Sequence, residues 1–211
     1  MSLAQEIVKD AALGVAVVDA PQEVNAFLKP GNAATIWRRQ PVSSFQSWID
    51  RLAPEHLPQG RIVLRTEAVR TALTEFCALA QTPESQERER LIDDVTALAH
   101  MFAELMEARY LRLRLQAVTS NACRKFHVDA ITARLVCTYR GAGTQYGVST
   151  DGTDPSRVFA VATGAPILLR GSLWPEEPAS GLLHRSPPIE GTGETRLVLV
   201  LDPIFDLEEE E

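Results

Sequence analysis

The sequence is poor in cysteine and contains no long apolar run. Its three cysteines, Cys77, Cys123 and Cys137, are widely spaced and odd in number, which argues against a disulfide framework and predicts reduced thiols in a cytoplasmic protein. The longest apolar stretches, such as 197–201, fall far short of the about 20 residues that cross a bilayer. No basic segment followed by an apolar one opens the chain, so neither a signal peptide nor a membrane partner is expected.

Positive charge is also in short supply. The 211 residues carry 21 Lys and Arg against 28 Asp and Glu, a net charge of −7. An acidic surface repels phosphate backbones, so nucleic acid is not an expected partner. The segment 204–211 ends in a block of like charges and is interpreted as an acidic tail. No long Pro- or Ser-rich linker divides the rest, and a single domain over 1–211 is predicted.

The N-terminal part, 1–110, is predicted to supply strands and helices that pack on a strand-rich C-terminal part. Expected elements are strands at 13–19 and 33–38 and helices at 43–52, 66–80 and 84–108. Thr82 is the expected N-cap of the longest helix. The apolar side chains of this helix follow a spacing of 4, 3, 4, 3, which predicts one face packed on a core. This stripe consists of Leu91, Val95, Leu98, Phe102 and Leu105.

After residue 110 the apolar period changes from that of a helix to that of a strand. Leucines alternate with Arg112 and Arg114, which are interpreted as one polar face of a strand. Many short strands separated by glycine turns favour a sandwich or a closed barrel over 111–203. The predicted fold class is therefore α+β. The expected strands are 111–118, 123–128, 133–139, 157–162, 165–170, 181–186 and 195–201.

His127 and Asp129 are the first candidates for chemistry. In a strand, residues i and i+2 point to the same face, about 6.6 Å apart, so an imidazole and a carboxylate at this spacing can converge on one metal ion. The alternative is a histidine bonded to a nearby aspartate at a solvated strand end. The other early histidines, His56 and His100, lie in a turn and on a helix and are expected to be structural.

His184 precedes a turn, and a symmetric hairpin centred on Glu190 would place Arg196 opposite it, within roughly 5 Å. A guanidinium beside a metal with open positions suits a bidentate anion. The alternative is a surface arginine that flanks a buried strand. Two histidines and one carboxylate leave metal positions free, as in non-haem Fe(II) oxygenases. The predicted metal ligands are therefore His127, Asp129 and His184.

These residues, together with the segments 134–139 and 163–169, resemble the Fe(II)/2-oxoglutarate-dependent dioxygenases, in particular their prolyl-hydroxylase branch. The resemblance implies a double-stranded β-helix, also called a jelly roll or cupin-like fold. It also implies Fe(II) and 2-oxoglutarate as cofactors, with Arg196 holding the far carboxylate of 2-oxoglutarate. Two features depart from that branch: the Gly-Ala-Gly-Thr turn at 141–144 comes early, and an arginine stands where lysine is usual.

The chain as a whole resembles a family of uncharacterised bacterial proteins of similar length. The resemblance is carried by a Cys-x-x-x-Phe-His-x-Asp block at 123–129, a Thr-Tyr-x-Gly-x-Gly-Thr block at 138–144 and a His-Arg-Ser-Pro-Pro block at 184–188. It implies no activity. A zinc-binding protein of metal homeostasis is the alternative function, because the same triad can hold Zn(II). A non-catalytic cupin-like binding module is the third.

Three further residues are assigned with their alternatives. Tyr139 is predicted to contribute to cofactor binding, or else to pack inside the barrel. Trp174, on the loop 172–181, is predicted to cover the substrate site, or else to lie in the core. Cys123 is expected in the core if its segment is a strand, and beside His127 on a shared zinc if the segment is a helix. The substrate is expected to be a small molecule or a peptide.

Overall fold

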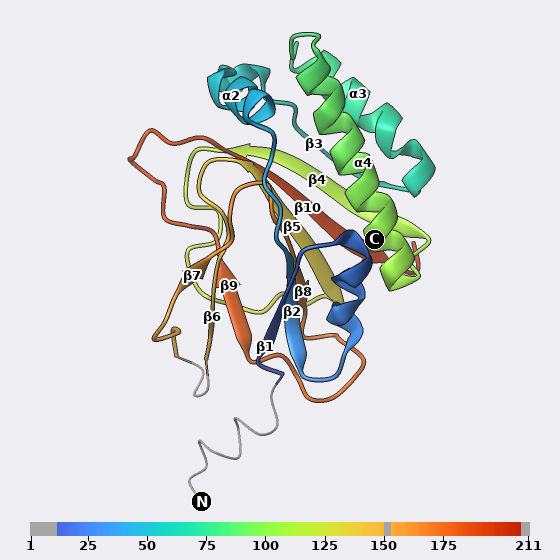
Figure 1. The fold of residues 1–211 in the computed structure, drawn as a ribbon, viewed down its shortest axis with the longest axis vertical. Helices are drawn as coiled ribbons and strands as arrows, with labels where there is room; N and C mark the ends of the chain where they lie inside the picture. The colour runs from blue at the N-terminus through green and yellow to red at the C-terminus, as the bar shows by residue number, and fades with distance from the viewer. Residues whose placement is uncertain (1–11, 150–152, 208–211) are drawn as a thin grey trace, which may run out of the picture.

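The protein is described here by a computed structural model covering residues 12–149 and 153–207. Its strands form two sheets that face each other, and the helices cover the outer face of the larger sheet (Figure 1). The chain is thus an α+β protein with a jelly-roll core. The larger sheet has the order β1 (Gly14–Val18), β2 (Asn32–Trp37), β8 (Pro166–Arg170), β5 (Ala133–Arg140), β10 (Arg196–Ile204), β4 (Tyr110–Val118) and β3 (Gly60–Leu64). The smaller sheet has the order β7 (Phe159–Ala160), β6 (Gln145–Val148) and β9 (Leu182–Arg185).

The two parts of the chain share one sheet. Strands β1, β2 and β3 come from the N-terminal part and pair within the larger sheet with β8 and β4 of the C-terminal part. The N-terminal strands thus complete the barrel, in addition to the helices that cover it.

Three α-helices and three 3-10 turns occupy the described N-terminal part. Helix α4 begins two residues later than predicted, because Ser85, and not Thr82, accepts the capping hydrogen bond from the amide of Arg88. The hydroxyl of Thr82 instead donates to the carbonyl of His56. The elements are η1 (Pro21–Leu28), α2 (Ser43–Arg51), η2 (Pro54–His56), η3 (Thr66–Ala68), α3 (Val69–Leu79) and α4 (Gln86–Met106).

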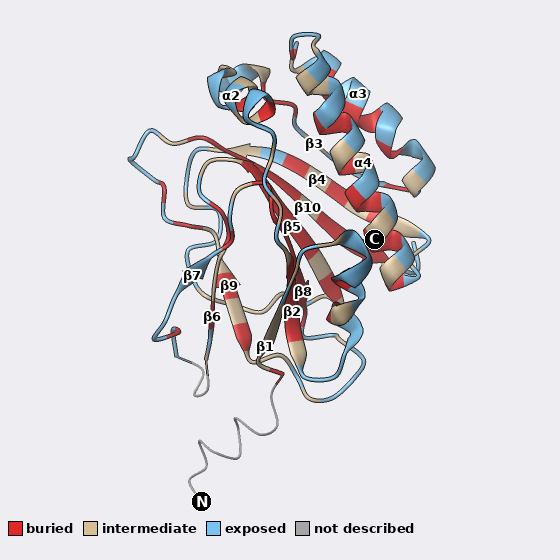
Figure 2. Cartoon of the chain, viewed as in Figure 1, coloured by how far each residue is buried: buried red, intermediate tan, exposed pale blue. Residues whose placement is uncertain are grey.

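The core lies between the helices and the larger sheet. Figure 2 shows buried residues along β4, β10 and β5 and on the side of α4 that faces them. The apolar stripe predicted for α4 is confirmed, with Leu105 only partly buried. On β4 the buried leucines at 111, 113 and 115 belong to this core. Arg112 and Arg114 alternate with them and point to the space between the two sheets, where both approach Asp202.

Several predicted strands differ from those observed. The segment 123–128 is largely irregular, and its one ladder contact in the described structure is the bridge between His127 and His184. This segment lies in the connection from β4 to β5 of the larger sheet and meets β9 of the smaller sheet only at that bridge. The strand predicted at 157–162 shrinks to β7. Strands β3 and β6 were missed, because one is a short edge strand and the other has Gly147 in its interior.

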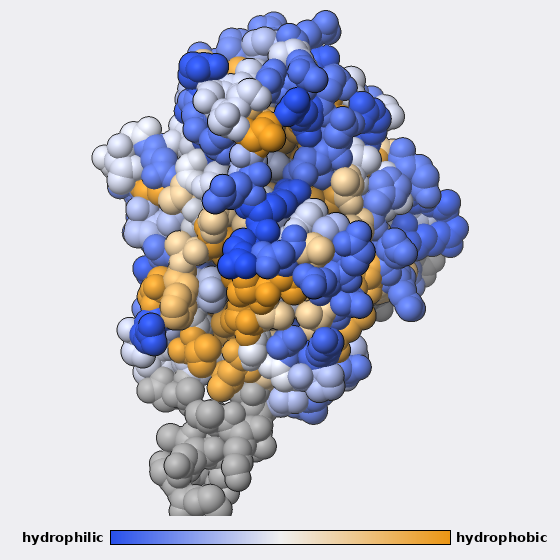
Figure 3. Space-filling view, in the orientation of Figure 1, coloured by the Kyte–Doolittle hydropathy of each residue, from blue (hydrophilic) through white to orange (hydrophobic). Residues whose placement is uncertain are grey.

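The three cysteines are all free, and no helix in the described ranges is long and apolar enough to cross a membrane. The smaller sheet is short and leaves apolar side chains at the surface near its edge. Figure 3 shows this apolar area on the face where β1, β6 and β7 lie. Val17 of β1 and Phe159 of β7 are 55% and 44% exposed, and Phe159 stacks on Tyr146 of β6.

Candidate metal centre

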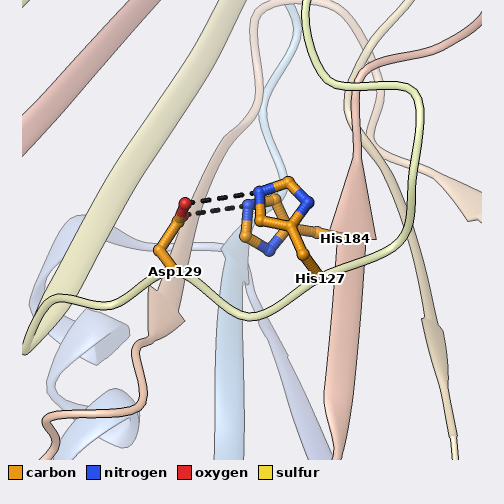
Figure 4. Close-up of side chains that lie close together, drawn as sticks. All are labelled: His127, Asp129 and His184. Atoms are coloured by element: carbon orange, nitrogen blue, oxygen red, sulfur yellow. Dashed lines mark ion pairs between the residues drawn. The ribbon is translucent and has the colours of Figure 1, made fainter. Parts of the chain in front are cut away.

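The structure brings His127, Asp129 and His184 together between the sheets (Figure 4). Nε2 of His127 lies 3.3 Å from Oδ1 of Asp129, and Nε2 of His184 lies 3.1 Å from Oδ2. One candidate ligand atom from each residue lies within 4.8 Å of the other two. The two imidazole rings are 4.6 Å apart. These three side chains therefore converge as the spacing of the sequence predicted.

Backbone contacts fix the relative positions of the three residues. His127 and His184 exchange two backbone hydrogen bonds of 3.1 and 3.0 Å. These bonds hold the loop that follows β4 against strand β9. The carbonyl of Asp129 accepts a hydrogen bond of 2.8 Å from the amide of Ser172. Strand β9 and two loops thus hold the centre, although 127–129 is not itself a strand.

Gly171 allows the loop that carries Asp129 to approach so closely. A Cβ atom at residue 171 would lie 1.8 Å from the carbonyl oxygen of Ile131 and 2.9 Å from that of Asp129. Gly171→Ala should displace this loop and weaken metal binding by at least about tenfold, as seen when a ligand's support is lost. Metal titration of the purified variant measures this.

Gly191→Ala is the control for that substitution. Its added Cβ meets nothing within 4 Å, but its φ of +79° makes it strained, so it should lose stability without losing metal affinity. Equal metal affinity in Gly171→Ala and the wild type would contradict the role of Gly171.

The tautomer of His127 suits a metal ligand. Its Nδ1 lies 2.9 Å from the carbonyl oxygen of Lys125. A carbonyl oxygen only accepts, so Nδ1 must carry the proton and donate. Nε2 is therefore the nitrogen turned towards Asp129, and once it carries no proton it is the atom that can bind a metal.

Asp129 is held in its ionised form. Burial by itself would raise the pKa of this carboxyl, but His184, Arg134 and His127 outweigh burial and lower the pKa to about 2. Nη1 of Arg134 lies 2.7 Å from Oδ2. Even so, Oδ2 is buried and accepts no hydrogen bond of good geometry from the described residues. Oδ2 is instead held by Nη1 of Arg134 and lies 3.1 Å from Nε2 of His184, and a carboxylate kept ionised in this way can serve as a metal ligand.

The donor set also fits a metal. Two imidazole nitrogens and one carboxylate oxygen, with further positions open, suit Fe(II) and Zn(II). The residues present therefore fit the metal that the sequence predicted.

In the metal-free protein, Asp129 should contribute stability that disappears in acid. Its folded pKa of about 2 lies below the ordinary 3.8, so folding favours the ionised form. The contribution, roughly 2 kcal/mol, is fully present above pH 3.8 and is lost as the pH falls towards 2. Unfolding free energies of chelator-treated wild type and Asp129→Asn should converge over that window. A difference that does not change with pH would contradict this.

The two histidines of the triad line a cavity of about 140 Å³ between the sheets. That volume has room for on the order of ten water molecules, so it suits a small molecule. The side chains that line it include Arg114, Cys123, His127, Arg134, His184 and Arg196.

Arg196 lies in this cavity, but not for the predicted reason. The hairpin between His184 and Arg196 does not exist, because β9 pairs with β6 whereas β10 pairs with β4 and β5. The connection 186–195 crosses from one sheet to the other. Both residues nevertheless face the space between the sheets.

The guanidinium of Arg196 is buried, with 2% of the residue exposed. Nε donates to the carbonyl of Ala142 at 2.6 Å, and Nη2 donates to the hydroxyl of Thr138 at 3.3 Å. Burial lowers its pKa to about 10, opposed only by Glu194. Among the described residues no carboxylate lies within ion-pair distance of it, so Glu194 compensates this cation only from further away.

Two predicted site residues lie elsewhere. Tyr139 faces the helices, where its hydroxyl donates to Asp94 at 2.6 Å. Residues 134, 136 and 138 of β5 point to the opposite face, towards the cavity. Because successive side chains of a strand alternate between its faces, Tyr139 cannot reach the cavity. Trp174 packs edge-on against Phe27 at 5.1 Å and belongs to the helix-side core. Both assignments to the site are corrected, and the core alternatives hold.

Cys123 is neither in the core nor a neighbour of His127 on a helix. It is exposed and lines the cavity, but its thiol does not belong to the group of converging ligand atoms. Arg114 and Arg134 also line the cavity and were missed as site residues. Their signal in the sequence was arginine at alternate positions of strands whose other face is apolar.

The fold is similar to that of two plant dioxygenases. The complex of dioxygenase for auxin oxidation 1 from Arabidopsis thaliana with 2-oxoglutarate matches with a TM-score of 0.57 at 11% identity, covering 92% of this chain and 94% of that one. The rice dioxygenase for auxin oxidation matches with a TM-score of 0.52 at 12% identity, covering 90% and 83%. At these identities the likeness concerns the fold.

The chain belongs to the family described as protein of unknown function DUF1826, which matches residues 18–202. No curated protein matches the sequence significantly.

Proposed function

We propose that this protein is a mononuclear Fe(II), 2-oxoglutarate-dependent oxygenase that acts on a small molecule. One observation carries the proposal. The two histidines that converge with Asp129 line a cavity that is also lined by Arg196, whose buried guanidinium forms no ion pair among the described residues. A metal with open positions and a fixed cation beside it are what a chelating keto-acid with a second carboxylate requires. The likeness of fold to a solved complex with 2-oxoglutarate supports the proposal.

Each residue has a distinct part in this function. His127, Asp129 and His184 would hold the iron, which supplies the activation of dioxygen. Arg196 would bind the far carboxylate of 2-oxoglutarate. The hydroxyl of Thr138 and the carbonyl of Ala142 hold the Arg196 guanidinium in place. Asp129 and Arg196 are largely shielded from water, so their charge interactions are stronger than in solution.

The test is made on wild-type protein purified without chelators. Under anaerobic conditions with Fe(II), addition of 2-oxoglutarate should produce the weak visible charge-transfer band of a metal-chelated keto-acid. Admission of air should then release succinate slowly, even without substrate. Neither a band nor succinate with fully iron-loaded protein would overturn the proposal.

A zinc-binding protein is the second candidate. The exposed Cys123 lines the same cavity and would bring a soft ligand close to the triad, which suits Zn(II). Affinity alone does not favour Fe(II) over Zn(II) at such a site. Tight stoichiometric zinc, together with no 2-oxoglutarate band under Fe(II), would favour this function.

A further inference from the structure

A cluster of arginines lies inside the barrel beside the metal centre. Arg134 binds the buried carboxylate of Asp202 through two contacts of 2.7 and 2.9 Å. Arg114 approaches the same carboxylate at 3.4 Å and Arg112 at 3.9 Å. Asp202 is only 1% exposed, so three guanidiniums gather around one buried anion.

This cluster carries more positive than negative charge. Its second carboxylate is Asp129, which Arg134 also contacts, and a bound divalent ion would draw on that carboxylate. Arg61, the cross-strand neighbour of Arg114 on β3, adds a further cation. Consistently, burial and then Arg134, Arg61 and Arg112 lower the pKa of Arg114, whereas only Asp202 opposes them.

Arg114 has an unused donor. Its Nε is buried and donates to no acceptor among the described residues, and its one contact with Asp202 is long. A buried guanidinium N–H without an acceptor is unfavourable. Because Arg114 lines the metal cavity, a ligand oxygen in that cavity is the natural acceptor.

Arg114 and Arg196 lie at different ends of the cavity. On β10 the partner of Arg114 is Val200, four residues from Arg196 and therefore about 13 Å along the strand. The Arg196 side is closed, whereas the side chain of Arg114 is 23% exposed. A small dicarboxylate that chelates the metal and reaches Arg196 cannot also reach Arg114, so the second cation is available to another molecule.

We propose that Arg114 binds a carboxylate of the substrate, and that the substrate of this centre is a small organic anion. Its apolar body would lie against Val198 and Val200, which line the cavity between the two arginines. This inference rests on the proposed function, because it assigns Arg196 to the co-substrate and Arg114 to the substrate.

The experiment compares two probes of equal shape, phenylacetate and phenylacetamide, by calorimetry. The full chain is loaded with Zn(II) and 2-oxoglutarate, so that no turnover occurs. Wild type should bind the acid more tightly than the amide. Arg114→Met should weaken the acid about thirtyfold, the effect of one charge-assisted contact, and leave the amide unchanged. Arg114→Lys, which keeps the charge, should retain part of the preference and shows that loss in Arg114→Met is not misfolding.

Arg88→Met on α4 is the matched control. Arg88 is similarly shielded, with 15% of its side chain exposed, and its Nε likewise lacks an acceptor, but it lies outside the cavity. It should keep the wild-type preference for the acid.

Three outcomes would overturn the inference: no preference for the acid in wild type, an unchanged preference in Arg114→Met, or loss of the preference in Arg196→Met instead. The acid and the amide are also titrated into metal-free protein without 2-oxoglutarate, so that the role of Arg114 is tested apart from the proposed function. If the wild type fails to bind 2-oxoglutarate, the proposed function fails, whereas the acid-to-amide ratio in Arg114→Met still decides whether Arg114 binds the anion.

Discussion

Replacing His127 by alanine is expected to abolish stoichiometric metal binding and leave the fold intact. Three side chains hold the ion, and removal of one takes away a ligand outright. The loss should exceed the tenfold to hundredfold typical of an outer-sphere partner, so at least about a hundredfold in affinity is expected. His127 lies on an irregular segment with a third of its side chain exposed, so its ring contributes little to the core.

Elemental analysis of His127→Ala protein purified beside the wild type measures this loss. His100→Ala is the control, because His100 lies exposed on α4, away from the triad. It should keep full metal occupancy. Circular dichroism and the melting temperature of the metal-free forms test whether the fold survives. Full occupancy in His127→Ala would show that the ion, if any, binds elsewhere.

Asp129 is the less suitable position for this test. Its carboxylate compensates Arg134 as well as the two histidines, so Asp129→Ala removes an anion from an arginine-rich interior. Removing one partner of a buried pair is destabilising in itself. A loss of metal in Asp129→Ala would thus mix a lost ligand with a disturbed charge balance, which His127→Ala avoids.

Much of the fold and of the centre was predictable from periodicity and spacing. The period of two after residue 110 and the stripe on α4 depend on burial alone, so the sequence carries them directly. The pair His127 and Asp129 was found by a strand rule although the segment is not a strand. The prediction succeeded because the chain is extended at the bridge between His127 and His184. This local geometry is enough to bring the side chains of His127 and Asp129 to the same side.

The errors share one physical cause: a strand's alternation separates its two faces but does not say what covers each face. Arg112 and Arg114 were interpreted only as one polar face of a strand, and the sequence did not indicate that this face is turned to the smaller sheet and to Asp202. Tyr139 was assigned to the cavity, although it occupies the helix-side face of β5. The predicted hairpin between His184 and Arg196 was wrong for a related reason. A connection that crosses between two sheets and a hairpin turn look the same in the sequence 186–195.

Arg196→Met is expected to weaken 2-oxoglutarate binding to the Fe(II) protein about a hundredfold. Arg196 faces the cavity without an ion pair, so a carboxylate that reaches it gains a charge-assisted, bidentate contact. Loss of such a contact costs about 2–3 kcal/mol. The methionine keeps the apolar stem and removes the charge, and the metal ligands stay in place. Metal content should therefore remain at the wild-type level.

The charge-transfer band, followed during an anaerobic titration with 2-oxoglutarate, measures this effect. The band should vanish from Arg196→Met at concentrations that saturate the wild type and return at much higher ones. Arg170→Met is the matched control: Arg170 is 3% exposed and bonds backbone carbonyls, as Arg196 does, but its acceptors are Phe27 and Lys29. If both variants lose the band, the cause is a disturbed fold. If Arg196→Met binds as tightly as the wild type, the far carboxylate lies elsewhere. Loss in Arg196→Met alone assigns this arginine to the co-substrate, because both substitutions remove a buried charge but only Arg196 lines the cavity.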